Sequence, residues 1–94
     1  SGVVLNSSDM SMFINDTKTD LSKNEFRILQ ILFENAGHIV SRDTLMRRLW
    51  ETDCFVDENT LTVNVTRLRR KLDGIGLQNF IVTRKGMGYL LVEE

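Results

Sequence analysis

The amino-acid sequence predicts an α+β fold: an N-terminal antiparallel sheet, three helices and a C-terminal β-hairpin, in that order. Short apolar or alternating runs separated by turn residues fill the first part of the chain. Apolar residues with helical spacing, each group preceded by a capping residue, fill the middle. Two further apolar runs flank a glycine-containing basic turn near the C-terminus. The 94 residues suffice for a single domain with a modest core.

The N-terminal part predicts a small meander of three strands. Val3–Asn6 and residues 10–15 are apolar or alternating runs, and Ser7-Ser8-Asp9 between them is typical of a turn. Asn15-Asp16 makes a second turn before a third run at residues 17–21. We expect this meander to cover one side of the core.

The first predicted helix begins with a capping box, in which the Ser22 hydroxyl accepts from the Glu25 amide and the Glu25 carboxylate accepts from the Ser22 amide. Leu21 and Phe26 occupy the positions of a hydrophobic staple. Gly37 is expected in the left-handed C′ position that ends the helix. Residues 38–40 are too few for anything but an extended bridge.

The second predicted helix has Ser41 as its N-cap. Its buried stripe is expected to contain Leu45, Met46, Leu49 and Trp50. A loop at residues 51–56 follows and contains Cys54 and Phe55. Either Asp57 or Asn59 then caps the third helix, because both residue types are favoured N-caps.

The chain is organised around the third predicted helix, residues 58–72. At about 100° per residue, one narrow arc contains the apolar residues Leu61, Val65, Leu68 and Leu72. Much of the other side carries Thr60, Val63, Asn64, Arg67, Arg70 and Lys71. Such groups read base edges and bind phosphates, although the same pattern also describes an ordinary solvated face.

A basic hairpin is predicted directly downstream, with strands at residues 80–83 and 89–92. Arg84-Lys85-Gly86-Met87-Gly88 forms its turn, which the glycines make tight. A helix upstream and a basic hairpin downstream favour the DNA-reading interpretation of the third helix. The sequence therefore predicts a winged helix-turn-helix, with the third helix as its recognition helix.

The formal net charge of −1 hides an uneven distribution of charge along the chain. Residues 59–90 contain six basic residues and a single acid, Asp73. Residues 1–58 contain six basic and ten acidic residues, and Glu93 and Glu94 follow at the end. A one-sided positive field of this kind steers a polyanion to one face.

Composition excludes several other classes of protein. No apolar run approaches the length of a membrane span, and the cytoplasm is the expected compartment. A single cysteine, Cys54, excludes an internal disulfide, and the lone His38 excludes a standard zinc site. Ser1-Gly2 is expected to be a cloning remnant outside the fold, and the chain a piece of a longer protein.

Several motifs at their particular spacing resemble one known family. They are LSKNEF from residue 21, SRDTL from residue 41, Trp50, Thr60 with RLRRKL from residue 67, and GMGY from residue 86. The whole chain resembles the output domain of two-component response regulators of the OmpR/PhoB type. The resemblance implies a transcription factor that binds duplex DNA, normally joined to an N-terminal receiver domain, absent here, and served by a histidine kinase.

The resemblance also implies finer properties. Residues 59–65 look most like the branch that responds to bacitracin, lantibiotics and other envelope-active peptides, and so to antibiotic resistance. The family's dimer contacts lie in the receiver, so we expect a mainly monomeric domain and a direct-repeat operator with a spacing of about 10–11 base pairs. The loop at residues 51–56 matches a segment that meets RNA polymerase in some members.

The family's DNA contacts fall on eleven residues of this sequence. Arg67 matches the arginine that reaches bases, Val63 a contact to a thymine methyl, and Lys85 the wing arginine that enters the minor groove or rests on phosphate. Trp50 matches an indole that reaches the DNA backbone, although a core role fits equally well. The other expected contacts, mostly to phosphate, are Thr60, Asn64, Thr66, Arg70, Lys71, Thr83 and Arg84. Asn64 replaces a commoner histidine, and Thr66 stands where many members carry a second arginine.

Two other classes of function compete with this prediction. An enzyme is disfavoured, since no Ser/His/Asp, Cys/His or paired-carboxylate arrangement is supported. A winged helix that binds proteins or RNA is the second class, because fold does not fix function. The basic residues of the third helix and the hairpin count against a purely protein partner. No exposed aromatic pair is expected as a stacking platform for single strands.

Overall fold

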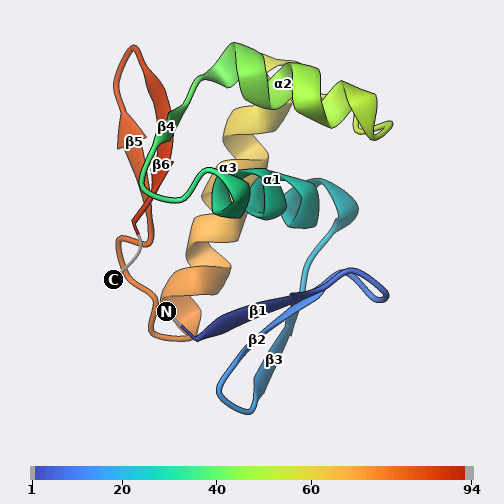
Figure 1. Ribbon diagram of the computed structural model, residues 1–94, viewed down its shortest axis with the longest axis vertical. Coiled ribbons are helices and arrows are strands. Elements are labelled where there is room, and N and C mark those ends of the chain that lie inside the picture. Colours follow the sequence, from blue (N-terminus) through green and yellow to red (C-terminus); the bar gives the residue numbers. More distant parts are fainter. Residues whose placement is uncertain (1, 93–94) are drawn as a thin grey trace.

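The computed structural model describes residues 2–92 and confirms the α+β winged helix-turn-helix (Figure 1). Ser1, half of the expected cloning remnant, lies outside the described residues, as do Glu93 and Glu94. The helices are α1 (Lys23–Glu34), α2 (Arg42–Glu51) and α3 (Glu58–Gly74). The strands are β1 (Val3–Asn6), β2 (Ser11–Ile14), β3 (Thr17–Asp20), β4 (Ile39–Val40), β5 (Ile81–Arg84) and β6 (Gly88–Leu91).

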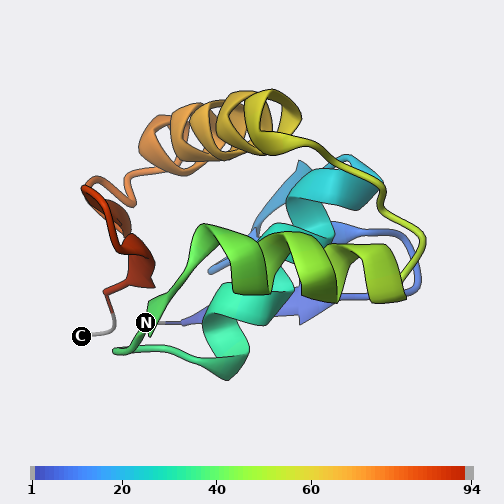
Figure 2. The same cartoon turned by 90° about the horizontal axis from the view of Figure 1, so that it is seen from above.

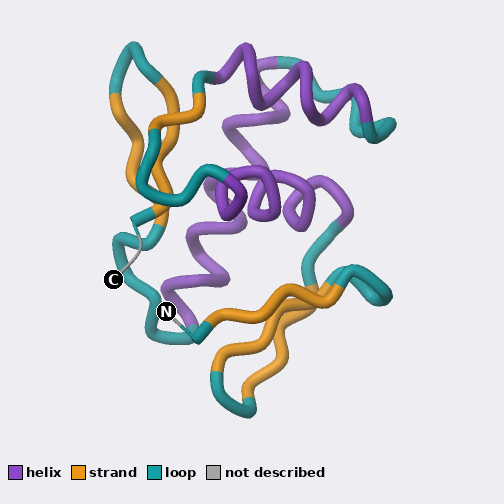
Figure 3. Tube along the Cα trace, viewed as in Figure 1, coloured by secondary structure: helices purple, strands orange, loops and turns teal. Residues whose placement is uncertain are grey.

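The N-terminal meander forms the expected antiparallel sheet, with strand order β1-β2-β3. Val4 pairs with Phe13 on one face of the sheet, and Met12 pairs with Thr19 on the other, because successive residues of a strand alternate between faces. Met12 is fully buried and belongs to the hydrophobic core. The sheet lies at one end of the molecule, next to α1 and the C-terminal end of α3 (Figures 1 and 3).

The C-terminal hairpin belongs to a second antiparallel sheet with strand order β4-β6-β5. The predicted extended bridge supplies β4, in which Val40 pairs with Tyr89 of β6. We call β5, β6 and the turn between them, residues 81–91, the wing. Its inner strand is therefore attached by backbone hydrogen bonds to the segment that leads into α2.

This packing requires a residue without a Cβ at position 88, which is Gly88. Its φ is +144°, and a Cβ at this position would lie 2.1 Å from the Val40 carbonyl oxygen. Backbone atoms at such a distance cannot give way as a flexible side chain would. Only glycine lets β6 approach the Val40–Ser41 backbone this closely.

The three helices enclose one apolar core with the two sheets at its margins. Phe26, Leu29 and Leu32 of α1 are fully buried, as are Leu45 and Leu49 of α2. The capping box of α1 is present: Ser22 N donates to Glu25 Oε1 at 2.8 Å, and Glu25 N donates to Ser22 Oγ at 3.2 Å. None of the helices in residues 2–92 is long and apolar enough to cross a membrane.

Three sequence-based assignments need correction. The C-cap of α1 is Asn35, so Gly37 lies two residues beyond the cap and not directly after it, although its φ is left-handed at +81°. Helix α3 continues to Gly74, two residues further than predicted, with Ile75 as its C-cap. Trp50 is 56% exposed and does not belong to the buried stripe of α2, because the helix ends one residue later and Trp50 lies beside Phe55 of the following loop.

Candidate nucleic-acid interface

Helix α3 lies at one edge of the molecule, with one long side uncovered and the wing beside it (Figure 2). The opposite side buries the four predicted apolar residues, Leu61, Val65, Leu68 and Leu72, each at most 1% exposed. Fully burying one such side chain stabilises the fold by about 1.5–3 kcal/mol. Packing therefore fixes which side of α3 faces solvent.

Asp57 caps the N-terminus of α3, and Asn59 does not. Asp57 Oδ1 accepts a hydrogen bond from Thr60 N at 2.7 Å. The Thr60 amide is the main reason that the pKa of Asp57 lies below its ordinary value of 3.8. The charged form is the better acceptor, and it also interacts favourably with the helix dipole. Asn59 is left exposed.

The uncovered side of α3 carries Val63, Thr66, Arg67 and Arg70, all exposed as predicted. Asn59 lies one turn before Val63 on the same side, and we call these five residues the outer face of α3. Val63 is 46% exposed, which leaves its methyl groups free for an apolar contact. Asn59 was considered in the sequence only as a cap. Its spacing of four residues from Val63 is the signal that places it on this face.

The sequence predicted Asn64 on the open side of α3, but the structure places it elsewhere. Its side chain is only 6% exposed, and Nδ2 donates to the Thr60 carbonyl at 2.9 Å. Asn64 lies three residues after Leu61 and four before Leu68, so it borders the buried stripe. Thr60 is half-buried for the same reason. The amide of Asn64 is thus bonded within its own helix.

Lys71 also makes internal contacts. Its Nζ lies 2.7 Å from Glu25 Oε1 and donates to the Asp20 carbonyl at 3.1 Å. Glu25 is 2% exposed. Burial alone would raise the pKa of Glu25, but Lys71 and the Ser22 amide outweigh it and hold the pKa below its ordinary value of 4.5. Lys71 therefore joins the end of α3 to the start of α1.

Arg69, which the sequence analysis did not single out, joins α3 to the wing. Its Nε donates to the Ile81 carbonyl at 3.0 Å, and its Nη2 donates to the Thr83 hydroxyl. Thr83 is exposed, but its oxygen is already an acceptor. Arg69 lies on neither the buried stripe nor the outer face, and that intermediate position is the only signal of its role in the sequence.

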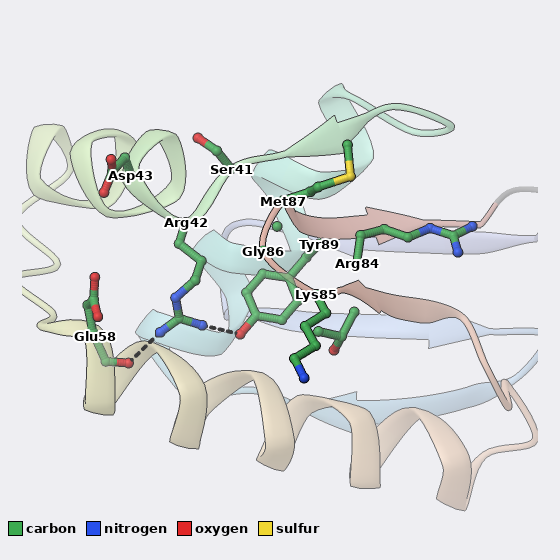
Figure 4. Close-up of a pocket in the computed structure, with 11 residues that line it drawn as sticks. Ser41, Arg42, Asp43, Glu58, Arg84, Lys85, Gly86, Met87 and Tyr89 are labelled. Carbon is green, nitrogen blue, oxygen red and sulfur yellow. Dashed lines mark hydrogen bonds between the residues drawn. The ribbon is translucent and has the colours of Figure 1, made fainter.

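The turn of the wing borders a hollow of about 430 Å³. Its lining comes from the start of α2, the first residue of α3 and the wing, and includes Arg42, Glu58, Arg84, Lys85 and Tyr89. Lys85 extends across the hollow toward α3, whereas the side chain of Arg84 points away from Arg42 and Glu58 (Figure 4). Met87 is 60% exposed at the tip.

Four cations on these two elements keep their charge available. Within residues 2–92, no acidic side chain lies within ion-pair distance of Arg67, Arg70, Arg84 or Lys85, and none of these four side chains donates a hydrogen bond. Two lie on the outer face of α3 and two on the wing. The wing therefore adds two cations to the two on α3.

Trp50 and Phe55 form an exposed aromatic pair, which the sequence analysis did not expect. They are 56% and 63% exposed, and their ring centroids lie 5.0 Å apart at an interplanar angle of 85°. Trp50 Nε1 donates a long hydrogen bond of 3.4 Å to the Val56 carbonyl. Cys54, in the same loop, is buried. The two rings are nearly perpendicular, so they do not form one continuous surface for successive stacked bases.

The chain is similar to known transcriptional regulatory proteins. The family model "Transcriptional regulatory protein, C terminal" matches residues 16–91. The sensory transduction protein BceR of Halalkalibacterium halodurans is 53% identical over 75 residues, which cover 80% of this chain and 32% of that protein. The chain thus spans about a third of the length of this curated relative.

Two solved structures have the same fold. The C-terminal domain of the nisin resistance regulator NsrR, a lantibiotic response regulator, superimposes with a TM-score of 0.91 at 40% identity, covering 100% of this chain and 95% of that one. The DNA-binding domain of Klebsiella pneumoniae RstA, solved in complex with the RstA box, gives 0.79 at 25% identity, covering 98% and 92%. The chain therefore belongs to the family of C-terminal domains of transcriptional regulatory proteins, the OmpR/PhoB-type winged-helix DNA-binding domains.

Proposed function

We propose that this domain recognises specific duplex DNA with two surfaces, as the output domain of a two-component response regulator that controls transcription. The outer face of α3 would enter the major groove, and the wing would lie at the adjacent minor groove. The observation that carries the proposal is a set of four cations without partners among the described residues, Arg67, Arg70, Arg84 and Lys85, divided between an uncovered helix face and the wing.

The proposed contacts are of two kinds, those to base edges and those to phosphates. Arg67 would donate to a guanine edge, and Val63, one turn away, would contact a thymine methyl. Arg70 and Arg84 would bind phosphates, and Lys85 would approach the minor groove or the phosphates beside it. Asn64, Lys71 and Thr83 would support these surfaces without contacting DNA, because their polar groups are already bonded to the protein.

The physiological signal would be an envelope-active peptide of the lantibiotic type. The similarity to NsrR, a lantibiotic response regulator, supports this, together with the resemblance of residues 59–65 to that branch of the family. In the full-length protein a receiver domain and its histidine kinase would supply the switch. A reporter driven by the selected operator should respond to nisin, and a reporter that stays silent with every such peptide would contradict this assignment.

Two copies would bind side by side in the same orientation, so the operator would be a direct repeat with half-sites about 10–11 base pairs apart. A single module of this size typically covers only about 600–1,000 Å² of protein surface on DNA, so each copy alone would bind modestly. Selection from random duplexes tests both points. A strictly palindromic site, or a tight dimer in ultracentrifugation without DNA, would contradict the arrangement.

The same selection separates this function from a protein- or RNA-binding role. Affinity for the selected duplex should exceed affinity for random duplex and fall with rising salt, because bound phosphates release counterions. Structured RNA and single strands of the same sequence serve as competitors. If RNA competes as well as the duplex does, the domain is an RNA-binding or interaction module instead.

A second candidate interaction is with RNA polymerase, through the loop after α2. The exposed Trp50–Phe55 pair favours it, because large exposed aromatic side chains are enriched at protein interfaces. We propose that Phe55 contributes to activation without contributing to DNA binding. Phe55→Ala should leave operator affinity within about twofold of wild type and reduce transcription in vitro. An unchanged transcript level would remove polymerase as a partner of this loop.

A further inference from the structure

Arg42 joins three elements that are distant in the sequence. Its Nη1 donates to the Tyr89 hydroxyl of β6 at 2.5 Å. Its Nη2 donates to the Glu58 carbonyl at 2.8 Å and to the Thr62 hydroxyl at 2.9 Å, both in the first turns of α3. In Figure 4 the guanidinium lies between the wing and the start of α3, at the end of the hollow. Arg42 thus links the two proposed DNA-binding surfaces from a third element, α2.

The acceptors are all uncharged: a phenol, a peptide carbonyl and a hydroxyl. Within the described residues no carboxylate lies within ion-pair distance of Arg42. The interaction is therefore directional, and its geometry depends on the planar fork of the guanidinium, which presents several donors in fixed directions. A lysine would keep the charge but could not hold these three acceptors with the same geometry.

The bonds of Arg42 act on the base of the wing, and its tip remains free. Tyr89 is 4% exposed and adjoins Gly88, where β6 touches the Val40–Ser41 backbone. The turn with Lys85 and Met87 is exposed. Arg42 therefore fixes the inner strand of the wing relative to the first turns of α3, while Arg69 fixes β5 relative to the middle of the helix.

We infer that Arg42 is a positioning residue for DNA recognition: it sets the distance between the wing and the recognition helix before DNA binds. This inference rests on the proposed function, in which the two surfaces bind neighbouring grooves at once. Holding both surfaces at the right separation in the free protein removes an ordering cost from binding. Without Arg42, α3 should still bind in the major groove, but the contribution of the wing to operator affinity should fall.

The test is a set of double-mutant cycles on the operator obtained by selection. Lys85→Ala measures the contribution of the wing, and Arg67→Ala measures that of α3. Each is made in wild type, in Arg42→Lys and in Tyr89→Phe, which removes one acceptor and no charge. Arg48→Lys is the matched control, because Arg48 lies on the same helix and its Nη2 bonds Glu34 of α1 at 2.6 Å, away from the wing.

In wild type and in Arg48→Lys, Lys85→Ala should weaken operator binding by about threefold to fivefold. In Arg42→Lys and Tyr89→Phe this loss should shrink to below about twofold, whereas the loss from Arg67→Ala should remain. An unchanged Lys85→Ala loss in both backgrounds overturns the inference. So does a simultaneous disappearance of the Arg67→Ala loss, because that pattern means general damage to the fold.

The same binding measurements also test the proposed function separately. If wild type binds the selected operator and random duplex equally, sequence-specific recognition is wrong, and the inference falls with it. If wild type discriminates between them and only the cycles fail, the function stands and Arg42 is not a positioning residue.

Discussion

Four basic residues lie within five positions of α3, and they divide into two pairs with different surroundings. Arg67 and Arg70 are exposed on the outer face and have no partner among the described residues. Arg69 bonds β5, and Lys71 bonds the buried Glu25. A helix turns by about 100° per residue, so neighbours in a basic run face different parts of the protein. The local sequence therefore overstates the number of cationic side chains that are free to contact DNA.

The two pairs should differ in the effect that a substitution has. Removing a residue of the internal pair, Arg69 and Lys71, should lower stability or move the wing. Removing a residue of the outer pair, Arg67 and Arg70, should change DNA binding and leave stability nearly unchanged.

The largest expected effect is on stability, from Lys71→Ala. It leaves Glu25 buried without its counter-charge, and breaking a fully buried pair costs about 3–5 kcal/mol. The Lys71 side chain is 37% exposed, so we expect a smaller loss, about 2–3 kcal/mol, in the free energy of unfolding by urea. Arg70→Ala, the adjacent control, should stay within about 0.5 kcal/mol. Equal effects of the two substitutions would show that the pairs do not differ.

The same ion pair predicts a pH dependence of stability. The pKa of Glu25 is below its ordinary value of 4.5 in the folded protein, so its charged form stabilises the fold above about pH 4.5. That stabilisation is lost as the pH falls through the folded pKa. In Lys71→Ala the effect of burial should dominate and raise the pKa of Glu25. The charged Glu25 would then destabilise the variant at neutral pH, and that destabilisation should disappear as the pH falls. Lys71→Ala should therefore lose less stability than wild type between about pH 7 and 3, which urea unfolding would detect. An equal loss of stability on acidification in both proteins contradicts it.

Arg67→Ala should cause the largest loss of specific binding. Loss of its proposed base contact costs about 1–3 kcal/mol on the selected operator. Binding to random duplex should fall much less, because the base contact is absent there. Fluorescence anisotropy on both duplexes measures the difference. Equal losses on the two DNAs would reassign Arg67 to phosphate.

Arg70→Ala should weaken binding on all sequences alike. As a proposed phosphate contact, it should lower the slope of log K against log salt by about one unit. Lys71→Ala, measured where it remains folded, should leave that slope unchanged, since its ammonium is bonded to Glu25. A change in slope for Lys71→Ala and none for Arg70→Ala would reverse the assignment of the two pairs.

The smallest expected effect comes from Lys85 in the wing. A cation near a narrow minor groove should give a preference for A·T flanks of about 1 kcal/mol or less. Lys85→Arg should strengthen the preference, because a guanidinium is less strongly hydrated, and Lys85→Ala should abolish it. Titrations on matched A·T and G·C flanks test this. If Lys85→Ala loses equal affinity on both, the wing is an electrostatic clamp on phosphate.

The sequence by itself determined the order and type of the elements. Capping residues, apolar periodicity and turn chemistry are local properties, and they predicted the meander, the three helices and the hairpin. The buried stripe of α3 followed from spacing alone, as did the positions of Val63, Arg67 and Arg70 on the outer face. The ends of α1 and α3 were off by a few residues, because the cap depends on hydrogen bonds that spacing does not specify.

Tertiary structure decided which polar groups remain available. Arg42 bonds a tyrosine 47 positions away, and Lys71 bonds a glutamate 46 positions away. Asn64 turns inward against the core, and Trp50 stays exposed because none of the described elements covers the end of α2. A hydrogen bond needs both partners at about 2.7–3.2 Å with the right direction, and a local pattern contains only one of them. The sequence therefore located the proposed DNA-binding surface, and only the packing of distant segments showed which of its side chains support that surface from within.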